Sequence, residues 1–181
     1  SADVRVLKAQ LDLTAEALRS TRVSAPLWAF VIAVTASNEV GLVGNTAILR
    51  ALIMPAVLAA TMVLLSHAVS FYKQDTSGVS GHERTRGWFG RMVGLQVVIS
   101  AVWGLMPWLL WDSHSDLNHM FLAASTISIL AGLVISRASH MDMFLASLIP
   151  FTAMAALRFA FGSTWLDHGA AIVIPLVAVQ L

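Results

Sequence analysis

Uncharged apolar stretches, each about as long as a membrane is thick, divide this chain. Residues 51–72, 92–111 and 117–136 contain no Asp, Glu, Lys or Arg, and each stretch is 20 to 22 residues long. An α-helix rises about 1.5 Å per residue, so about 20 apolar residues cross a hydrocarbon core of about 30 Å. The pattern therefore predicts helices that span a membrane.

The charged segments between these stretches divide the rest of the chain in the same way. We expect an all-α membrane protein, a bundle of six transmembrane helices at about 23–40, 48–72, 88–111, 117–136, 141–161 and 164–181. Residues 1–22 are polar, with apolar positions at alternating steps of three and four, which predicts a cytoplasmic amphipathic helix before the bundle. That helix either lies along the membrane surface or its own bundle, or it leads into a dimer.

The overall composition agrees with a membrane protein. The chain is 57% hydrophobic and 12% charged, whereas soluble domains average about a quarter charged residues. It contains no Cys, which excludes disulfides, thiol nucleophiles and Cys-based metal sites. The formal net charge is only +1 and the positive residues are spread over several loops, so no nucleic-acid partner is indicated.

The Lys and Arg residues orient the predicted bundle. Nine of the eleven lie in residues 1–22, in residues 73–91 and at Arg137. With six spans, these segments all lie on one side of the membrane, and only Arg50 and Arg158 lie on the other. Short loops rich in Lys and Arg stay in the cytoplasm. We therefore expect a multi-pass membrane protein with both termini in the cytoplasm.

The fourth predicted span differs from the others in its small residues and in having no proline. Its small residues recur every fourth position and predict a close helix–helix contact; they are Ala124, Ser128, Gly132 and Ser136. Each other span contains one proline, at Pro26, Pro55, Pro107, Pro150 and Pro175. The pattern predicts a straight helix among bent ones.

Histidines and aspartates gather in the predicted outer loops. The candidates for a divalent metal site or a pH-responsive rim are Asp112, His114, Asp116, His119 and His168. Imidazole and carboxylate ligands suit zinc, copper or nickel, and histidine titrates near neutral pH. An ordinary solvated loop explains the same residues, because no two of the histidines have the i, i+4 spacing of a helical metal motif.

Charged residues at the predicted outer ends of helices are candidates for ligand binding. Glu39, Arg50 and Arg158 lie near the ends of the first, second and fifth spans, and charges at membrane depth are usually paired or functional. Glu39 either pairs with one of the arginines, or Arg158 binds the anionic group of a ligand. Trp103 lies deeper in the third span, where it either lines a pocket or contacts lipid.

Few residues indicate chemistry within the membrane. His67 and His140 both lie near cytoplasmic helix ends and are weak candidates for the axial ligands of a haem; otherwise we predict no cofactor. Ser80 lies in a Gly-rich segment that resembles a serine nucleophile motif, but it is predicted on the opposite face from His168. A nucleophile and its base must lie about 3 Å apart, so we predict no catalytic machinery in these residues.

The second half of the chain resembles a known group of bacterial proteins. The similarity lies in 87–91 (GWFGR), 100–110 (SAVWGLMPWLL), 118–122 (NHMFL), 131–136 (AGLVIS) and 144–162. These segments resemble the N-terminal multi-spanning input domains of sensor histidine kinases and related diguanylate cyclases and phosphodiesterases. The resemblance covers about half of the chain and carries no catalytic residues.

The resemblance and the charge pattern together lead to one expectation about function. We expect a membrane-embedded sensory domain, homodimeric, that passes a small-molecule or membrane signal to a cytoplasmic effector in the same chain, such as a histidine kinase of a two-component system. The last predicted helix ends without a positively charged stop, so we also expect the chain to continue beyond Leu181. A cyclase or phosphodiesterase effector, or a small transporter or channel, is the alternative.

Overall fold

The chain folds into a bundle of helices. A computed structural model describes residues 2–38, 45–75, 82–137 and 141–180, and this part contains helices and no strands, which confirms the predicted all-α class. The helices are α1 (Ala2–Asn38), α2 (Asn45–Asp75), α3 (His82–Gly104), α4 (Met106–Leu110), α5 (Asp116–Arg137), α6 (Met141–Ala160) and α7 (Trp165–Gln180).

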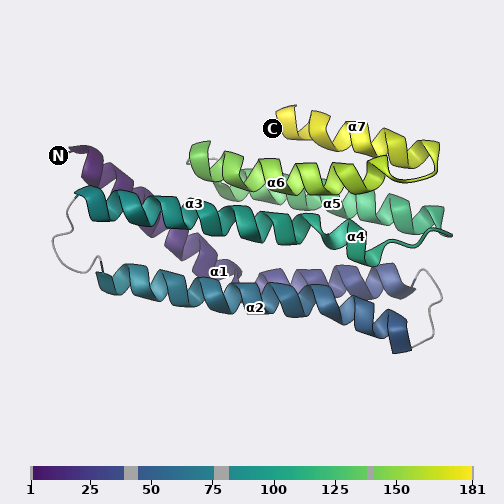
Figure 1. Cartoon of the computed structure of the whole chain (residues 1–181), viewed down its shortest axis with the longest axis horizontal. Helices are drawn as coiled ribbons and strands as arrows, with labels where there is room; N and C mark the ends of the chain where they lie inside the picture. Colours follow the sequence, from purple (N-terminus) through teal and green to yellow (C-terminus); the bar gives the residue numbers. More distant parts are fainter. Residues whose placement is uncertain (1, 39–44, 76–81, 138–140, 181) are drawn as a thin grey trace.

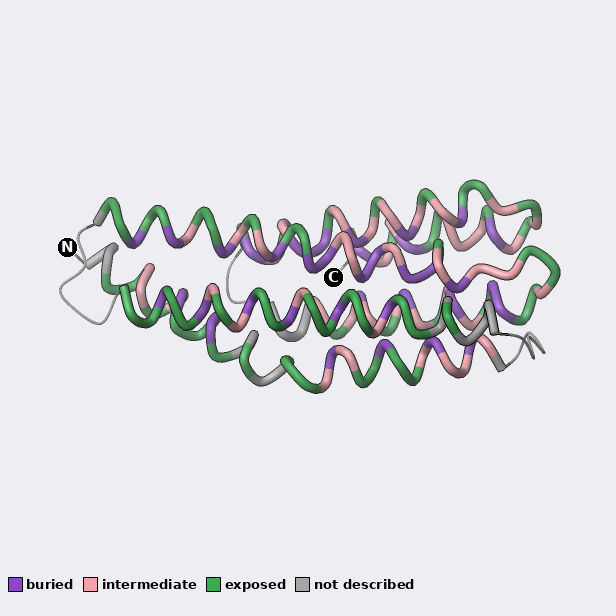
Figure 2. The backbone as a smooth tube through the Cα atoms, turned by 60° about the horizontal axis from the view of Figure 1, so that its bottom comes forward, coloured by how far each residue is buried: buried purple, intermediate pink, exposed green. Residues whose placement is uncertain are grey.

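Three of these segments are long and apolar enough to cross a membrane. They are Leu52–Asp75, Glu83–Leu110 and Met141–Ala160, while Arg22–Ser37 and Trp165–Gln180 are shorter apolar helices within the described residues. Only 28% of the apolar window in α2 is buried by the protein itself. Large apolar side chains such as Leu64 and Phe71 point outward, as the exposed positions in Figure 2 illustrate. A surface of this kind is compatible with a membrane protein.

The third predicted span is two helices rather than one. The expected helix over 88–111 is interrupted at Leu105, where α3 ends and the short α4 begins with Pro107 in its first turn. Proline has no N–H and its ring clashes with the preceding turn, so it starts a helix more readily than it continues one. Pro26, Pro55, Pro150 and Pro175 instead lie inside α1, α2, α6 and α7.

Residues 1–22 do not form a separate helical element. Helix α1 continues from Ala2 to Asn38, so the expected boundary at residue 22 is not a break in the backbone. Leu11 and Ala15 are buried in the N-terminal half of α1, and Asp12 accepts a hydrogen bond of 2.9 Å from the buried Tyr72 hydroxyl of α2. The N-terminal part of α1 therefore packs on the end of α2.

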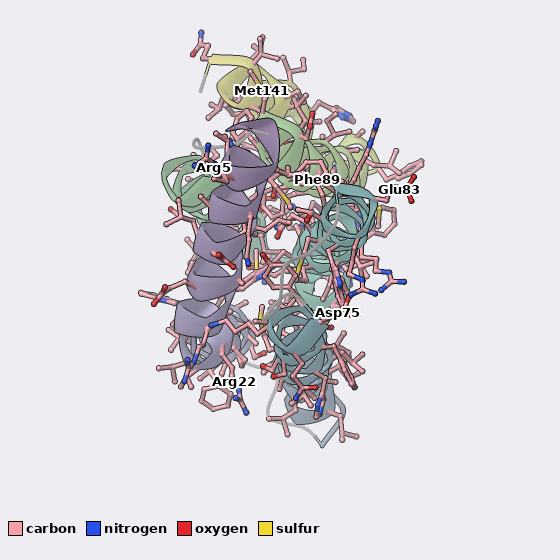
Figure 3. The ribbon with its side chains drawn as sticks, turned by 90° about the vertical axis from the view of Figure 1, so that its left-hand side faces the viewer. Arg5, Arg22, Asp75, Glu83, Phe89 and Met141 are labelled. Atoms are coloured by element: carbon pink, nitrogen blue, oxygen red, sulfur yellow. The ribbon has the colours of Figure 1, made fainter. Side chains whose placement is uncertain are left out.

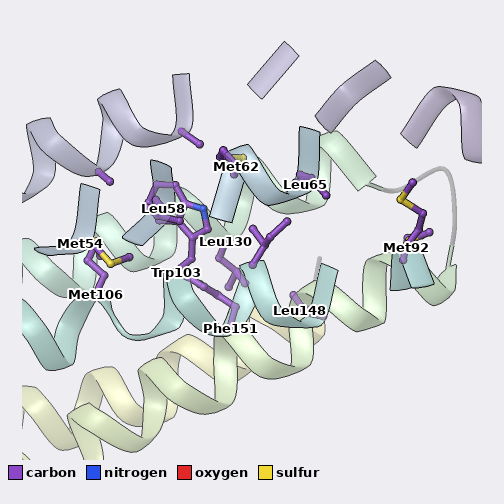
Figure 4. Close-up of a cluster of buried hydrophobic side chains, with 14 of the residues drawn as sticks. Met54, Leu58, Met62, Leu65, Met92, Trp103, Met106, Leu130, Leu148 and Phe151 are labelled. Atoms are coloured by element: carbon purple, nitrogen blue, oxygen red, sulfur yellow. The ribbon is translucent and has the colours of Figure 1, made fainter. Parts of the chain in front are cut away.

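The helices form two groups that meet along one side (Figure 1). Helices α1 and α2 make one antiparallel pair, and α3 packs on α6, which packs on α7, with α5 against both α6 and α7. Helices α3 and α6 pack closely at Gly104, where an added Cβ would lie 2.7 Å from Met154 Cβ. Figure 4 shows the apolar core between the two groups, with Trp103 close to Leu58.

Candidate functional site

A buried polar cluster closes one end of the bundle, where the connection from α4 to α5 meets the connection from α6 to α7. Asn118, in the first turn of α5, organises the first connection. Its side chain accepts a hydrogen bond of 3.1 Å from Asp112 N and donates to Leu110 O at 3.1 Å and to Ala36 O of α1 at 3.4 Å. One buried amide therefore joins α1, the end of α4 and the start of α5.

Asp167 organises the second connection as part of a helix cap. Asp167 N donates to Thr164 Oγ1 at 3.2 Å, and Thr164 N donates to Asp167 Oδ2 at 3.0 Å. This reciprocal pair is a capping box, which satisfies two backbone N–H groups at the start of a helix. Gly162 lies against the carboxylate, and a Cβ added there would overlap Asp167 Oδ2. The cap therefore holds a fully buried carboxylate in one position.

The second oxygen of this carboxylate faces His119. Asp167 Oδ1 lies 2.9 Å from His119 Nδ1, and the two side chains are 0% and 3% exposed. His119 Nε2 lies 2.7 Å from the backbone oxygen of Asp112. A carbonyl oxygen only accepts, so Nε2 carries a proton. Nδ1 and Oδ1 have no other polar partner within the described residues, so each of these two buried atoms has only the other to contact.

The Trp111 ring contacts both His119 of this pair and Arg158. The His119 ring stacks on Trp111 with centroids 3.8 Å apart, and the Arg158 guanidinium carbon lies 3.8 Å from the same ring centroid. The guanidinium of Arg158 therefore lies within cation–π distance of the ring that also stacks on His119. Phe159 closes the edge of the ring at 5.3 Å.

The structure brings together only part of the predicted metal or pH-sensing set. His119 and the backbone of Asp112 lie in the cluster, whereas His114, Asp116 and His168 are exposed. In the described part of the chain, no three His, Asp or Glu side chains come close enough to hold a metal ion. A metal at these residues stays a prediction. Asp167, which the sequence places beside His168 as a third aspartate of the same predicted face, is the partner of His119. Its spacing to Thr164 was the signal for its role in a cap.

The predicted ligand-binding residues lie in different places. Arg158 lies against Trp111 and, at 5.6 Å, Trp108. Glu39 and the side chain of Arg50 lie outside the described residues, so their pairing with Arg158 stays a prediction. Trp103 is 8% exposed and lines a cavity, as one of the two sequence alternatives predicted.

That cavity lies between the two helix groups and has a volume of about 670 Å³. Its walls come from α1, α2, α3 and α5, and they include Trp28, Thr35, Met62, Trp103 and Phe121. Pockets for small molecules have volumes of about 300–1,000 Å³ and mostly apolar walls. The cavity therefore has the size and lining for a small lipophilic molecule.

The small residues of α5 lie on the wall of this cavity. Ala124 and Ser128 are exposed there, and a Cβ added to Gly132 would meet no atom within 4 Å. The side chain of Ser136 lies outside the described residues. Within the described part of the chain the stripe makes no close helix contact, and its packing against another helix stays a prediction.

Of the two candidate haem ligands, only His67 lies within the described residues. His67 is exposed on α2, and His140 lies outside the described residues. Haem binding by this pair stays a prediction.

Comparison with known proteins adds no family assignment. No protein-family model, curated protein or solved structure matches the chain. The function must therefore be argued from the cavity, the buried cluster and the charge pattern.

Proposed function

We propose that the chain is a membrane-embedded input domain of a bacterial signalling protein, with a sensor histidine kinase as the favoured parent. The cavity between the two helix groups carries the proposal. A lipophilic ligand there contacts α1 on one side and α5 on the other, and α5 packs directly on α7, the last helix. A ligand shifts such an assembly only if it binds one arrangement more tightly than the other. Because the cavity lies between two groups of helices, a change in their relative position would change its walls and therefore its affinity for the ligand.

The proposed topology has six spans with both termini in the cytoplasm of the inner membrane. Nine of the eleven Lys and Arg residues on one side support it. In this topology the ligand enters from the bilayer or the outer side, and the signal leaves toward a cytoplasmic effector in the same chain. A homodimer is part of the proposal, supported by the alternating three- and four-residue spacing of apolar positions in residues 1–22.

A transporter or channel is the second candidate. Such a protein needs polar groups along a path through the membrane. The cavity walls in the described residues are mainly apolar, and the buried charged pair lies at one end of the bundle. These two features favour an input domain that binds a ligand over a route for ions or solutes.

The first test of the proposal is the coding sequence after Leu181. A helical linker followed by a phospho-accepting histidine module supports the kinase, and a cyclase or phosphodiesterase module supports the alternative effector. A stop codon directly after Leu181 contradicts the input-domain function.

The second test measures signalling. The complete protein in lipid nanodiscs is assayed for autophosphorylation with and without lipid extract, as wild type and as Gly132→Phe. The wild type should respond to the extract, and the variant with the filled cavity should not. An equal response of both proteins would exclude this cavity as the signal input.

A further inference from the structure

Three basic side chains gather around a second, smaller cavity between α1 and α2. Arg19 and Arg22 lie one turn apart on α1, and Lys73 lies near the end of α2. The cavity has a volume of about 300 Å³, and its remaining walls include Leu65 and Val69 of α2. Figure 3 views the bundle from this end, with Arg22 and the neighbouring end of α2 at Asp75 labelled. The chain fold thus brings together cations about fifty positions apart in sequence.

The electrostatics of this cavity favour an anion. No carboxylate lines it, and within the described residues none of the three cations forms a salt bridge. The carboxylates nearby on the two helices have other partners: Asp12 accepts from Tyr72, and Asp75 pairs with Arg84 and accepts from Trp88. Glu16, one turn before Arg19, is exposed and does not line the cavity. Three like charges around one space repel one another until an anion binds.

The position and the walls of the cavity indicate what kind of anion would bind there. Arg22 is the first residue of the apolar segment Arg22–Ser37 of α1, and Lys73 lies two residues before the end of the candidate span Leu52–Asp75. The cations therefore lie at the level where lipid headgroups meet hydrocarbon, and Leu65 and Val69 extend the cavity toward the apolar side. Basic pockets between transmembrane helices on the cytoplasmic side bind anionic lipid headgroups.

We propose that Arg19, Arg22 and Lys73 bind the phosphate of an anionic phospholipid, with one acyl chain along Leu65 and Val69. A lipid here joins the N-terminal half of α1 to α2, beside the hydrogen bond from Tyr72 to Asp12. The site requires that the chain lie in a membrane, but it does not depend on the signalling function. A stop codon after Leu181 would therefore contradict the input domain and leave this site intact.

The test uses the full chain in nanodiscs, with native mass spectrometry to count the phosphatidylglycerol molecules that stay bound. The variants are Arg19→Gln, Arg22→Gln and Lys73→Gln, and the matched controls are Arg5→Gln and Arg86→Gln, exposed basic residues that do not line the cavity. We expect about fivefold weaker binding of one phosphatidylglycerol for each cavity charge removed, from about 1 kcal/mol per basic residue. The controls should bind as the wild type does, and Lys73→Arg should retain binding.

Three results would overturn the proposal. Equal weakening in the controls would mean a general attraction of surface charge for anionic lipid. Equal binding of phosphatidylcholine would mean that the anionic charge is not recognised. Displacement of the lipid by millimolar inorganic phosphate would mean a site for free phosphate. Melting temperatures measured in phosphatidylcholine alone exclude unfolding as the cause of lost binding, and a variant that unfolds is replaced by the pair Lys73→Arg and Lys73→Gln.

Discussion

At the scale of single residues, the buried pair of His119 and Asp167 is the contact whose loss we expect to destabilise the fold most. Both side chains are almost fully buried, and each is held by a second interaction, His119 by Asp112 O and Asp167 by the cap with Thr164. A charge buried without its partner is far more costly than an intact pair. The stability of this end of the bundle therefore depends on both members of the pair.

Replacement of Asp167 should separate its two roles. Asp167→Ala removes the cap and the partner of His119, and we expect a loss of about 3–5 kcal/mol, the range for a broken buried pair. Asp167→Asn keeps an oxygen for Thr164 N and should lose about 1 kcal/mol less, the usual contribution of a cap. Thermal unfolding in detergent measures both. If Asp167→Ala melts as the wild type does, the pair does not stabilise the fold.

At the scale of helices, two glycines have opposite surroundings: one lies in a close helix contact and the other beside an open cavity. Gly104 of α3 allows the close approach of α6, because Phe151 O and Met154 Cβ would lie 3.0 and 2.7 Å from an added Cβ. Gly132 of α5 faces the open cavity. Small residues therefore serve close packing at one helix pair and leave space at another.

Gly104→Ala should destabilise the bundle. The added methyl group must push α6 away from α3, and overpacking of this kind costs about 1–3 kcal/mol. Gly94→Ala is the matched control, because a Cβ at Gly94 meets nothing within 4 Å and alanine is the better helix former by about 1 kcal/mol. Comparison of the two melting temperatures checks the prediction, and it is wrong if Gly104→Ala is as stable as Gly94→Ala.

Gly132→Phe should fill the larger cavity without displacing backbone. The probe is N-phenyl-1-naphthylamine, an apolar dye that fluoresces in dry sites and accepts energy from tryptophan. We expect saturable energy transfer from Trp103 and Trp28 in the wild type and its loss in Gly132→Phe, because the aromatic ring occupies the space between α1 and α5. Gly90→Phe, on an exposed face outside the cavity, should bind the dye normally. Loss of binding in both variants would argue against the cavity.

At the scale of the whole molecule, the two helix groups define the architecture. The pair α1/α2 meets the group α3–α7 across the larger cavity, and the apolar outer faces are compatible with a membrane protein. The proposed ligand between the groups and the proposed lipid between α1 and α2 would both contact α1. The proposed topology can be tested separately from both.

Reporter fusions should give opposite results at the two ends of the bundle. A reporter inserted after Ser80, between Lys73 and Arg84, should be cytoplasmic, because the neighbouring basic residues stay inside. A reporter inserted after Ser113, in the connection from α4 to α5, should be periplasmic. Dual alkaline phosphatase and fluorescent-protein fusions measure both positions. A periplasmic signal after Ser80 would reverse the proposed orientation.

The sequence alone determined the helical class, three segments long and apolar enough to cross a membrane, and the proline at which α4 begins. These properties depend on short-range rules: the rise per residue, the hydropathy of about twenty neighbours and the missing N–H of proline. For Trp103 the sequence left a pocket and lipid contact as alternatives, and the residue lines the larger cavity. It did not reveal that α1 continues through residue 22, because amphipathic and apolar helical patterns join without a break signal.

Only the tertiary structure decided which residues meet. His119 lies 2.9 Å from Asp167, 48 positions away, rather than beside His114 or Asp116, and Arg158 lies on Trp111. The small residues of α5 line a cavity, while Gly104 makes the tight contact. Arg19, Arg22 and Lys73 surround one space. Each of these facts depends on the rotation and the height at which one helix packs on another, and local sequence patterns specify neither.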